Sequence, residues 1–151
     1  MKTAFDCYHL FEKLIELHDV GHCCKHSDIT IEQMNQRLDL EKLKRISRFD
    51  ISEEELFEQM LFCAEDNAER IRDWLYHGTK RQEYFLLDCE KPIGTIIYRN
   101  KSWCNRNIGV KCSRLQIILT KYIEKDGDIS FHITTSYCEL TDDELKQKEA
   151  N

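Results

Sequence analysis

The sequence predicts an α+β protein in which about three N-terminal helices pack on a C-terminal antiparallel sheet of four to five strands. Apolar residues recur at helical spacing through most of residues 4–75, whereas the segments after residue 82 are rich in β-branched and aromatic residues. The pair Asp126-Gly127 separates two such segments and is a strong hairpin signal. We therefore expect one domain over 1–140, with a helical half at 1–78, a sheet half at 82–140 and a polar tail at 141–151.

Three helices are expected in the first half of the chain. The first covers residues 4–18, and the second begins near Asp28 or Thr30 and continues through a basic segment that ends near Phe49. Ser52 and Glu55 form a capping-box pattern that opens the third helix, and Gly78 is well placed to end it.

The second half reads as strands at 83–88, 93–99, 114–122 and 129–138. Residues 100–111 are expected to form a loop or a weak strand, because asparagines stand there beside basic residues. The last residues are polar and are expected to form a short helix or to fray.

Charge is distributed unevenly along the 151 residues. The net charge is −6, but residues 91–125 carry +7 within a chain whose first 90 residues carry −8. A basic block of this kind is typical of a surface that binds phosphate or an acidic partner. It is equally typical of a solvated sheet edge, where lysine prevents strand-to-strand aggregation.

Cysteine usage and hydropathy indicate the compartment. Eight cysteines are present without a C-x-x-C pair, so reduced thiols are the expectation and a disulfide framework the alternative. No apolar run approaches the ~20 residues of a membrane span, and the first residues lack the apolar core of a signal peptide. We expect a protein that is cytosolic where it is made and has no membrane partner.

One cluster combines histidine and cysteine, the side chains that suit zinc. It consists of His18, His22, Cys23, Cys24 and His26. The histidines are spaced four residues apart, but adjacent cysteines do not match the spacing of zinc sites, in which a turn separates a cysteine pair. The sequence favours an ordinary polar turn over a metal site, and we expect no cofactor.

The last predicted strand carries most of the candidate chemistry. Strict alternation places His132, Thr134 and Ser136 on one face and Thr135 and Tyr137 on the other. A histidine exchanges protons near neutral pH, and hydroxyl groups bind phosphate oxygens. The simpler interpretation is that these residues cover the solvent face of an antiparallel sheet.

The order of elements resembles the barnase/EndoU/colicin/RelE superfamily of ribonuclease toxins, which occur as modules of contact-dependent systems. The resemblance covers about residues 40–140 and rests on I-G-T-I-I-Y-R-N and on the closing H-I-T-T-S-Y. It implies that Thr135 and Tyr137 belong to the site. A bulge or a strong twist would be needed to bring these two residues to the face of His132. The chain also departs from the pattern, because residues 40–49 contain no histidine.

Together these observations predict a metal-independent ribonuclease that acts on RNA, including tRNA, with a cognate inhibitor as partner and with delivery to another cell as one route. The residues assigned to catalysis are His132, Thr135, Tyr137 and Arg114, and those assigned to substrate binding are Thr134, Ser136, Lys111, Arg45, Arg48 and Trp103. The alternative is a non-catalytic inhibitor or immunity-type protein whose acidic helical half binds a basic protein.

Overall fold

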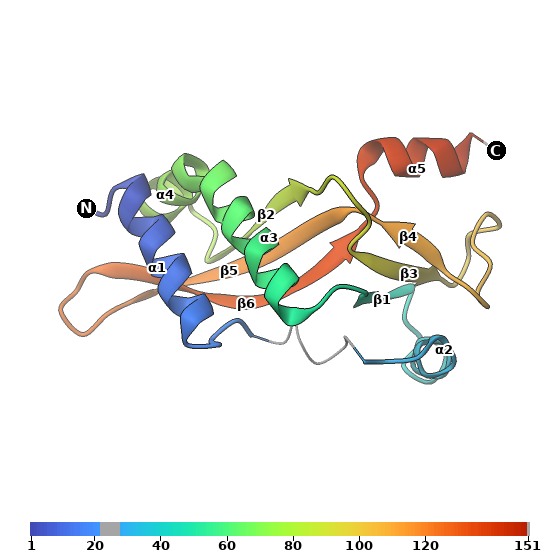
Figure 1. Cartoon of the computed structure of the whole chain (residues 1–151). Helices are drawn as coiled ribbons and strands as arrows, with labels where there is room; N and C mark the ends of the chain where they lie inside the picture. The colour runs from blue at the N-terminus through green and yellow to red at the C-terminus, as the bar shows by residue number, and fades with distance from the viewer. Residues whose placement is uncertain (22–27, 151) are drawn as a thin grey trace.

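The computed structural model describes residues 1–21 and 28–150, which form five helices and six strands (Figure 1). The elements in chain order are α1 (Ala4–Glu16), α2 (Ile31–Leu40), β1 (Arg45–Phe49), α3 (Glu53–Asp66), α4 (Ala68–His77), β2 (Gln82–Asp88), β3 (Gly94–Tyr98), β4 (Val110–Cys112), β5 (Arg114–Ile123), β6 (Ile129–Glu139) and α5 (Asp142–Glu149). The predicted α+β class is confirmed. None of the described helices is both long and apolar enough to cross a bilayer.

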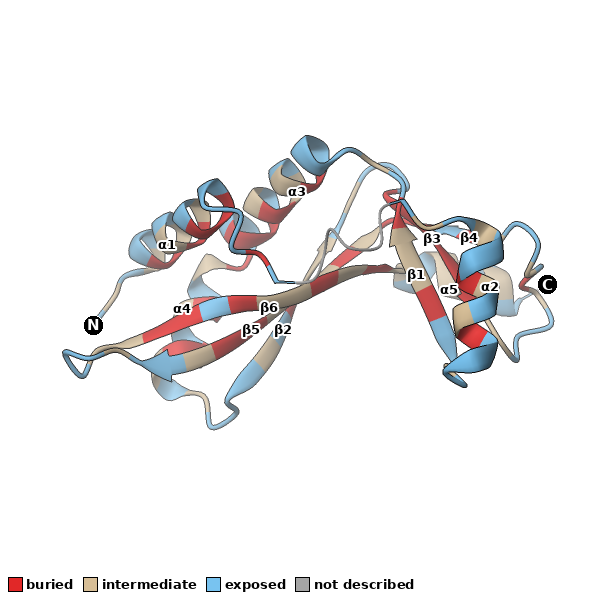
Figure 2. Ribbon diagram, turned by 90° about the horizontal axis from the view of Figure 1, so that it is seen from below, coloured by how far each residue is buried: buried red, intermediate tan, exposed pale blue. Residues whose placement is uncertain are grey.

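The strands form two antiparallel three-stranded sheets, with the orders β1-β3-β4 and β2-β5-β6. Helices α1 and α3 lie on the same face of the second sheet (Figure 1). Aromatic pairs mark the contact between helices and sheet: Phe11 packs on Phe131, and Trp74 packs edge-on against Phe85. Buried residues alternate along much of β5 and β6, and the same core continues into α2 and the first sheet. Figure 2 marks buried positions in both sheets.

The helices begin where their capping residues predict. Thr3 and Thr30 each form a complete capping box, and the Ser52 side chain accepts a hydrogen bond from the backbone N–H of Glu55. The predicted start of the third helix at Ser52 is therefore confirmed.

The basic segment after α2 is a strand, and the prediction of a continued helix was wrong. Lys42 has a left-handed backbone (φ 53°), which ends the helix. Beyond it, β1 pairs along its whole length with β3, and Ile46 and Phe49 are buried. Pairing and burial outweigh the helical propensity of the lysines and arginines in this segment. A strand therefore lies inside the half of the chain that was expected to be helical.

The predicted third helix is two helices that meet at Asn67. Its buried side-chain amide donates to the carbonyl oxygens of Cys63 and Leu86, at 2.9 and 3.0 Å. The second bond ties the helix break to β2, so that α4 leaves in a new direction. The predicted end at Gly78 is confirmed.

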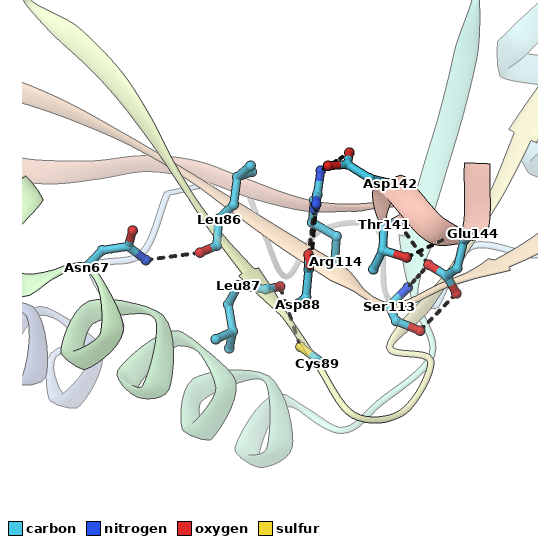
Figure 3. A network of polar contacts seen from close by, with 10 residues as sticks. All are labelled: Asn67, Leu86, Leu87, Asp88, Cys89, Ser113, Arg114, Thr141, Asp142 and Glu144. Carbon is cyan, nitrogen blue, oxygen red and sulfur yellow. Dashed lines mark hydrogen bonds and ion pairs between the residues drawn. The ribbon is translucent and has the colours of Figure 1, made fainter. Parts of the chain in front are cut away.

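The polar tail forms α5, and Figure 3 shows how it is attached. Thr141 and Glu144 form a capping box, and the Glu144 carboxylate also accepts hydrogen bonds from the backbone N–H and the hydroxyl of Ser113, both at 3.0 Å. The tail is thus docked on the start of β5.

Candidate functional site

A β-bulge in β6 determines which side chains share a face of the second sheet. Ile118 of β5 pairs with Thr135, and the next residue, Leu119, pairs with Ile133. Thr134 is therefore an extra residue on β6. An extra residue of this kind shifts the alternation of side chains by one position beyond it.

The bulge brings the histidine and the two residues implied by the family resemblance to one face. His132, Thr135 and Tyr137 pair with alternate residues of β5, so all three lie on the face opposite the helices. Ser136 lies on the other face, where it is only 4% exposed, and its hydroxyl has no hydrogen-bond partner among the described residues. Strict alternation had instead predicted that Ser136 lies on the same face as His132.

A shallow hollow surrounds His132 on this open face. It is lined by Arg81, Gln82, Thr120, His132 and Thr134 and measures about 580 Å³. The Gln82 amide donates to the Thr120 hydroxyl at 2.9 Å, and the hydroxyls of Thr120 and Thr134 share a hydrogen bond. An imidazole, a guanidinium, an amide and two hydroxyls in one hollow are the groups that bind and transform a phosphate ester. We call these five residues the His132 pocket.

The His132 imidazole is exposed and rests beside the Tyr122 ring, with the ring centroids 5.7 Å apart. Its position in the sheet follows from a row that crosses three strands: Gln82 pairs with Thr120, and Thr120 pairs with His132. Sequence reasoning missed Arg81, Gln82 and Thr120. The missing signal was the register of β2 on β5, since the hairpin motif indicates only the pairing of β5 with β6.

Tyr137 lies in a second polar group further along the same face. Its hydroxyl is 3.0 Å from the side-chain amide of Gln116, and the Arg45 guanidinium lies 6.0 Å from its ring centre. Arg45 forms an ion pair with Glu139. Burial, together with the negative charge of Glu139, raises the pKa of the Tyr137 phenol. The row of Tyr137 crosses β5 at Gln116 and that of His132 at Thr120, four positions further on, which corresponds to about 13 Å.

Arg114 forms ion pairs with two carboxylates (Figure 3). Its guanidinium contacts both oxygens of Asp88, at 2.6 and 3.2 Å, and contacts Asp142 at 3.1 Å. The hydrogen bonds to Asp88 and then to Asp142 raise the pKa of Arg114. The residue joins the end of β2 to the start of α5, and its charge is compensated inside the protein.

Arg48 and Lys111 both contact the carboxylate of Asp50, the residue that follows β1. Asp50 accepts from Arg48 at 2.8 Å, from Lys111 at 3.1 Å and from the Thr95 hydroxyl at 2.6 Å. Burial opposes ionisation of Asp50, but the three hydrogen bonds outweigh it and lower the pKa. These two predicted substrate-binding cations are therefore paired and lie outside the His132 pocket.

Other cations of the basic block also bind within the protein. Lys121 donates to the carbonyl oxygens of Trp74 and Gly78, at 3.1 and 2.7 Å. Arg99 donates to the carbonyl oxygens of Leu38 and Leu43. The block therefore owes much of its charge to residues that connect helices to strands, an explanation that the sequence alone did not suggest.

Trp103 contributes to packing. Its ring contacts Tyr98 edge-on, with centroids 5.1 Å apart, and it is partly buried against the core. It does not lie among the residues of the His132 pocket.

The predicted histidine–cysteine cluster is described only at its first member. His18 forms an ion pair with Glu53 at 3.1 Å, whereas His22, Cys23, Cys24 and His26 lie outside the described residues. Within 1–21 and 28–150, no three His, Cys, Asp or Glu side chains are grouped so that they could hold a metal ion.

Comparison with known proteins finds a structural similarity but no sequence family. No protein-family model matches the chain, and no curated protein matches it. A solved chain from the CdiA-CT/CdiI complex of Y. kristensenii 33638 is similar in structure, with a TM-score of 0.64 and 18% identity. The match covers 78% of this chain and 97% of that one.

Proposed function

We propose that this chain is a metal-independent ribonuclease of the toxin type, with the His132 pocket as its reaction centre. The observation that carries the proposal is the bulge at Thr134, which gathers His132, Thr134 and Thr135 on an open sheet face beside Arg81. A pocket of this composition binds a phosphodiester through the guanidinium and hydroxyls and places an imidazole beside the ribose.

The reaction follows from these groups. His132 takes the proton of the ribose 2′-hydroxyl, and the 2′-oxygen attacks the adjacent phosphorus atom. Arg81 stabilises the negative charge that develops on the non-bridging oxygens. The bond from phosphorus to the 5′-oxygen breaks, and that oxygen takes a proton from water. The products are a 2′,3′-cyclic phosphate and a free 5′-hydroxyl.

Tyr137 and Arg45 are assigned to a neighbouring nucleotide. Their distance of about 13 Å along the sheet from the row of His132 is too large for both groups to act on one phosphorus atom. Arg45 is 43% exposed in its side chain, so it retains access to a phosphate despite its pairing with Glu139. The two groups would hold the RNA strand along β6.

One likeness supports the toxin type, and a second supports membership of a toxin–immunity system, in which the matched chain is either of the two proteins. The closing strand resembles that of contact-dependent ribonuclease toxins, and Thr135 and Tyr137, which this resemblance assigns to the site, share a sheet face with His132. The fold is like that of a chain crystallised in a CdiA-CT/CdiI complex. A cognate inhibitor is accordingly part of the proposal, as is delivery into another cell.

A second candidate is a non-catalytic inhibitor or immunity-type protein. Its supporting observation is that Arg48, Lys111 and Arg114 are already paired with carboxylates, which leaves few predicted cations for RNA. The two candidates differ in cells: a ribonuclease arrests growth when it is produced without an inhibitor, and a binding protein is tolerated.

The product chemistry tests the ribonuclease. A short single-stranded RNA is incubated with the protein in excess EDTA, beside the same oligonucleotide with a 2′-deoxy sugar at each cleaved position. We expect cleavage of the first substrate only, with 2′,3′-cyclic phosphate ends. Cleavage of the deoxy substrate, or dependence on added metal, would contradict the mechanism.

A further inference from the structure

A groove between α3 and the connection from β2 to β3 has no role in the proposed reaction. It encloses about 650 Å³ and shares no lining residue with the His132 pocket. One wall is a single face of α3, because Glu55, Glu58, Gln59 and Phe62 follow helical spacing. The other wall is the segment from Leu87 to Ile93.

The groove is strongly acidic. Its lining includes four carboxylates, those of Glu55, Glu58, Asp88 and Glu90, and a single cation, Lys91. Asp88 is neutralised by Arg114. No ion pair is found for Glu58 or Glu90 in the described part of the chain, so their charges face the groove uncompensated. Nucleic acid is excluded from such a surface by charge repulsion.

An apolar surface lies among these charges. Phe62 is 46% exposed although it is one of the larger hydrophobic side chains of α3. Ile51, Leu87 and Pro92 line the same groove. An exposed aromatic ring bordered by carboxylates offers a site for an apolar side chain and, at the ring face, for a cation.

We propose that this groove binds a positively charged segment of a partner protein that carries an apolar anchor residue between lysines or arginines. The anchor packs on Phe62, and the flanking cations pair with Glu58 and Glu90. Charge complementarity selects this occupant, because opposite charges steer association and a buried apolar anchor supplies most of the affinity. The binding is independent of RNA cleavage, so the chain is able to hold a protein partner and keep its open sheet face accessible.

The test uses a fluorescein-labelled synthetic peptide of alternating lysine and leucine, with fluorescence polarisation as the readout. A peptide with serine in place of leucine tests the apolar anchor. Glu58→Lys and Phe62→Ala are expected to weaken binding about tenfold each, as for central interface residues. Glu69→Lys on α4 makes the same charge change outside the groove and is expected to alter binding less than about twofold.

Several results would overturn the proposal: no binding of the leucine peptide, equal binding of the serine peptide, or equal loss in Glu58→Lys and Glu69→Lys. Near-UV circular dichroism and thermal unfolding check that each variant is folded. If Phe62→Ala is unfolded, Glu90→Lys takes its place, because Glu90 lines the same groove from the loop between β2 and β3. Loss of RNA cleavage in His132→Ala with unchanged peptide binding separates this surface from the proposed reaction centre.

Discussion

Thr120 and Thr134 share a hydrogen bond between their side-chain hydroxyls, across β5 and β6 at the position of the bulge. Thr120 is also the pairing partner of His132. The extra residue, Thr134, is thus held on the open face beside the histidine. From Thr135 onward, each side chain of β6 lies on the face opposite to the one that strict alternation from His132 would give it. The composition of the site depends on this one insertion.

The first prediction concerns Ser136, whose hydroxyl is buried without a hydrogen-bond partner. Replacement by alanine removes an unsatisfied polar group, so we expect Ser136→Ala to raise the free energy of unfolding by up to about 1 kcal/mol. RNA cleavage should be unchanged, because the side chain faces the core. Urea denaturation and a cleavage assay measure the two effects, and a loss of cleavage in a fully stable variant would return Ser136 to the site.

Substitution of Gly21 tests how closely the chain packs against the bulge at Thr134. Its backbone is left-handed (φ 72°), and an added Cβ atom would overlap the carbonyl oxygen of Thr134. We expect Gly21→Ala to lower the free energy of unfolding by about 2–4 kcal/mol.

Gly127 in the hairpin is the matched control for this substitution. Its φ is 87°, but an added Cβ atom would meet nothing within 4 Å. Gly127→Ala should therefore cost only the backbone strain, about 1 kcal/mol. Equal losses in chemical denaturation would show that contact with Thr134 does not matter.

Substitution of two arginines distinguishes residues of the proposed site from residues that stabilise the fold. Arg81 lines the His132 pocket, and Arg81→Ala is expected to reduce cleavage about 10- to 100-fold with little change in stability. Arg114 is bound to Asp88 and Asp142, so Arg114→Ala should weaken the attachment of α5 and lower the thermal midpoint. Steady-state cleavage and thermal unfolding of both variants make the comparison. The reverse pattern would assign catalysis to Arg114, as the sequence suggested.

The next prediction concerns Asp50 and the loss of folding stability at acid pH. Its hydrogen bonds with Thr95, Lys111 and Arg48 lower the pKa in the folded state, against the effect of burial. A lowered folded pKa stabilises the protein above the unfolded value of about 4, and this contribution is lost as the pH falls through the folded pKa. Asp50→Asn should therefore lower stability by about 1–2 kcal/mol at pH 7.

The difference between Asp50→Asn and the wild type should shrink as the pH falls from about 5 to 2. Denaturation with urea at several pH values measures it. A constant difference across this range would show that the charge of Asp50 does not stabilise the fold.

Local patterns predicted much of the fold. The Ser52 capping box located the start of α3, and the Asp126-Gly127 pair located the hairpin of β5 and β6. The strand β1 was mistaken for helix because the lysines before it and its own two arginines favour helix locally, while its pairing with β3 depends on residues about fifty positions away. The break at Asn67 was missed for a similar reason, since the bond that fixes it reaches Leu86.

The site was predicted only in part. His132, Thr134, Thr135 and Tyr137 share the open face of the second sheet, but no local signal distinguishes a strand with a bulge from a regular one. Arg114 was assigned to catalysis, and Arg48 and Lys111 to substrate binding, because of their charge, and charge in a sequence does not reveal which carboxylates lie nearby in the fold. Arg81 stood outside the basic block and was overlooked.

The most direct test of the account is cleavage of total RNA and tRNA in excess EDTA by the wild-type protein, by His132→Ala and by Ser136→Ala. We expect discrete fragments from the wild type and from Ser136→Ala, and a loss of about 10²- to 10⁴-fold in rate for His132→Ala. Intact RNA with the wild type, or equal cleavage by His132→Ala, would contradict the assignment of the His132 pocket as a ribonuclease centre.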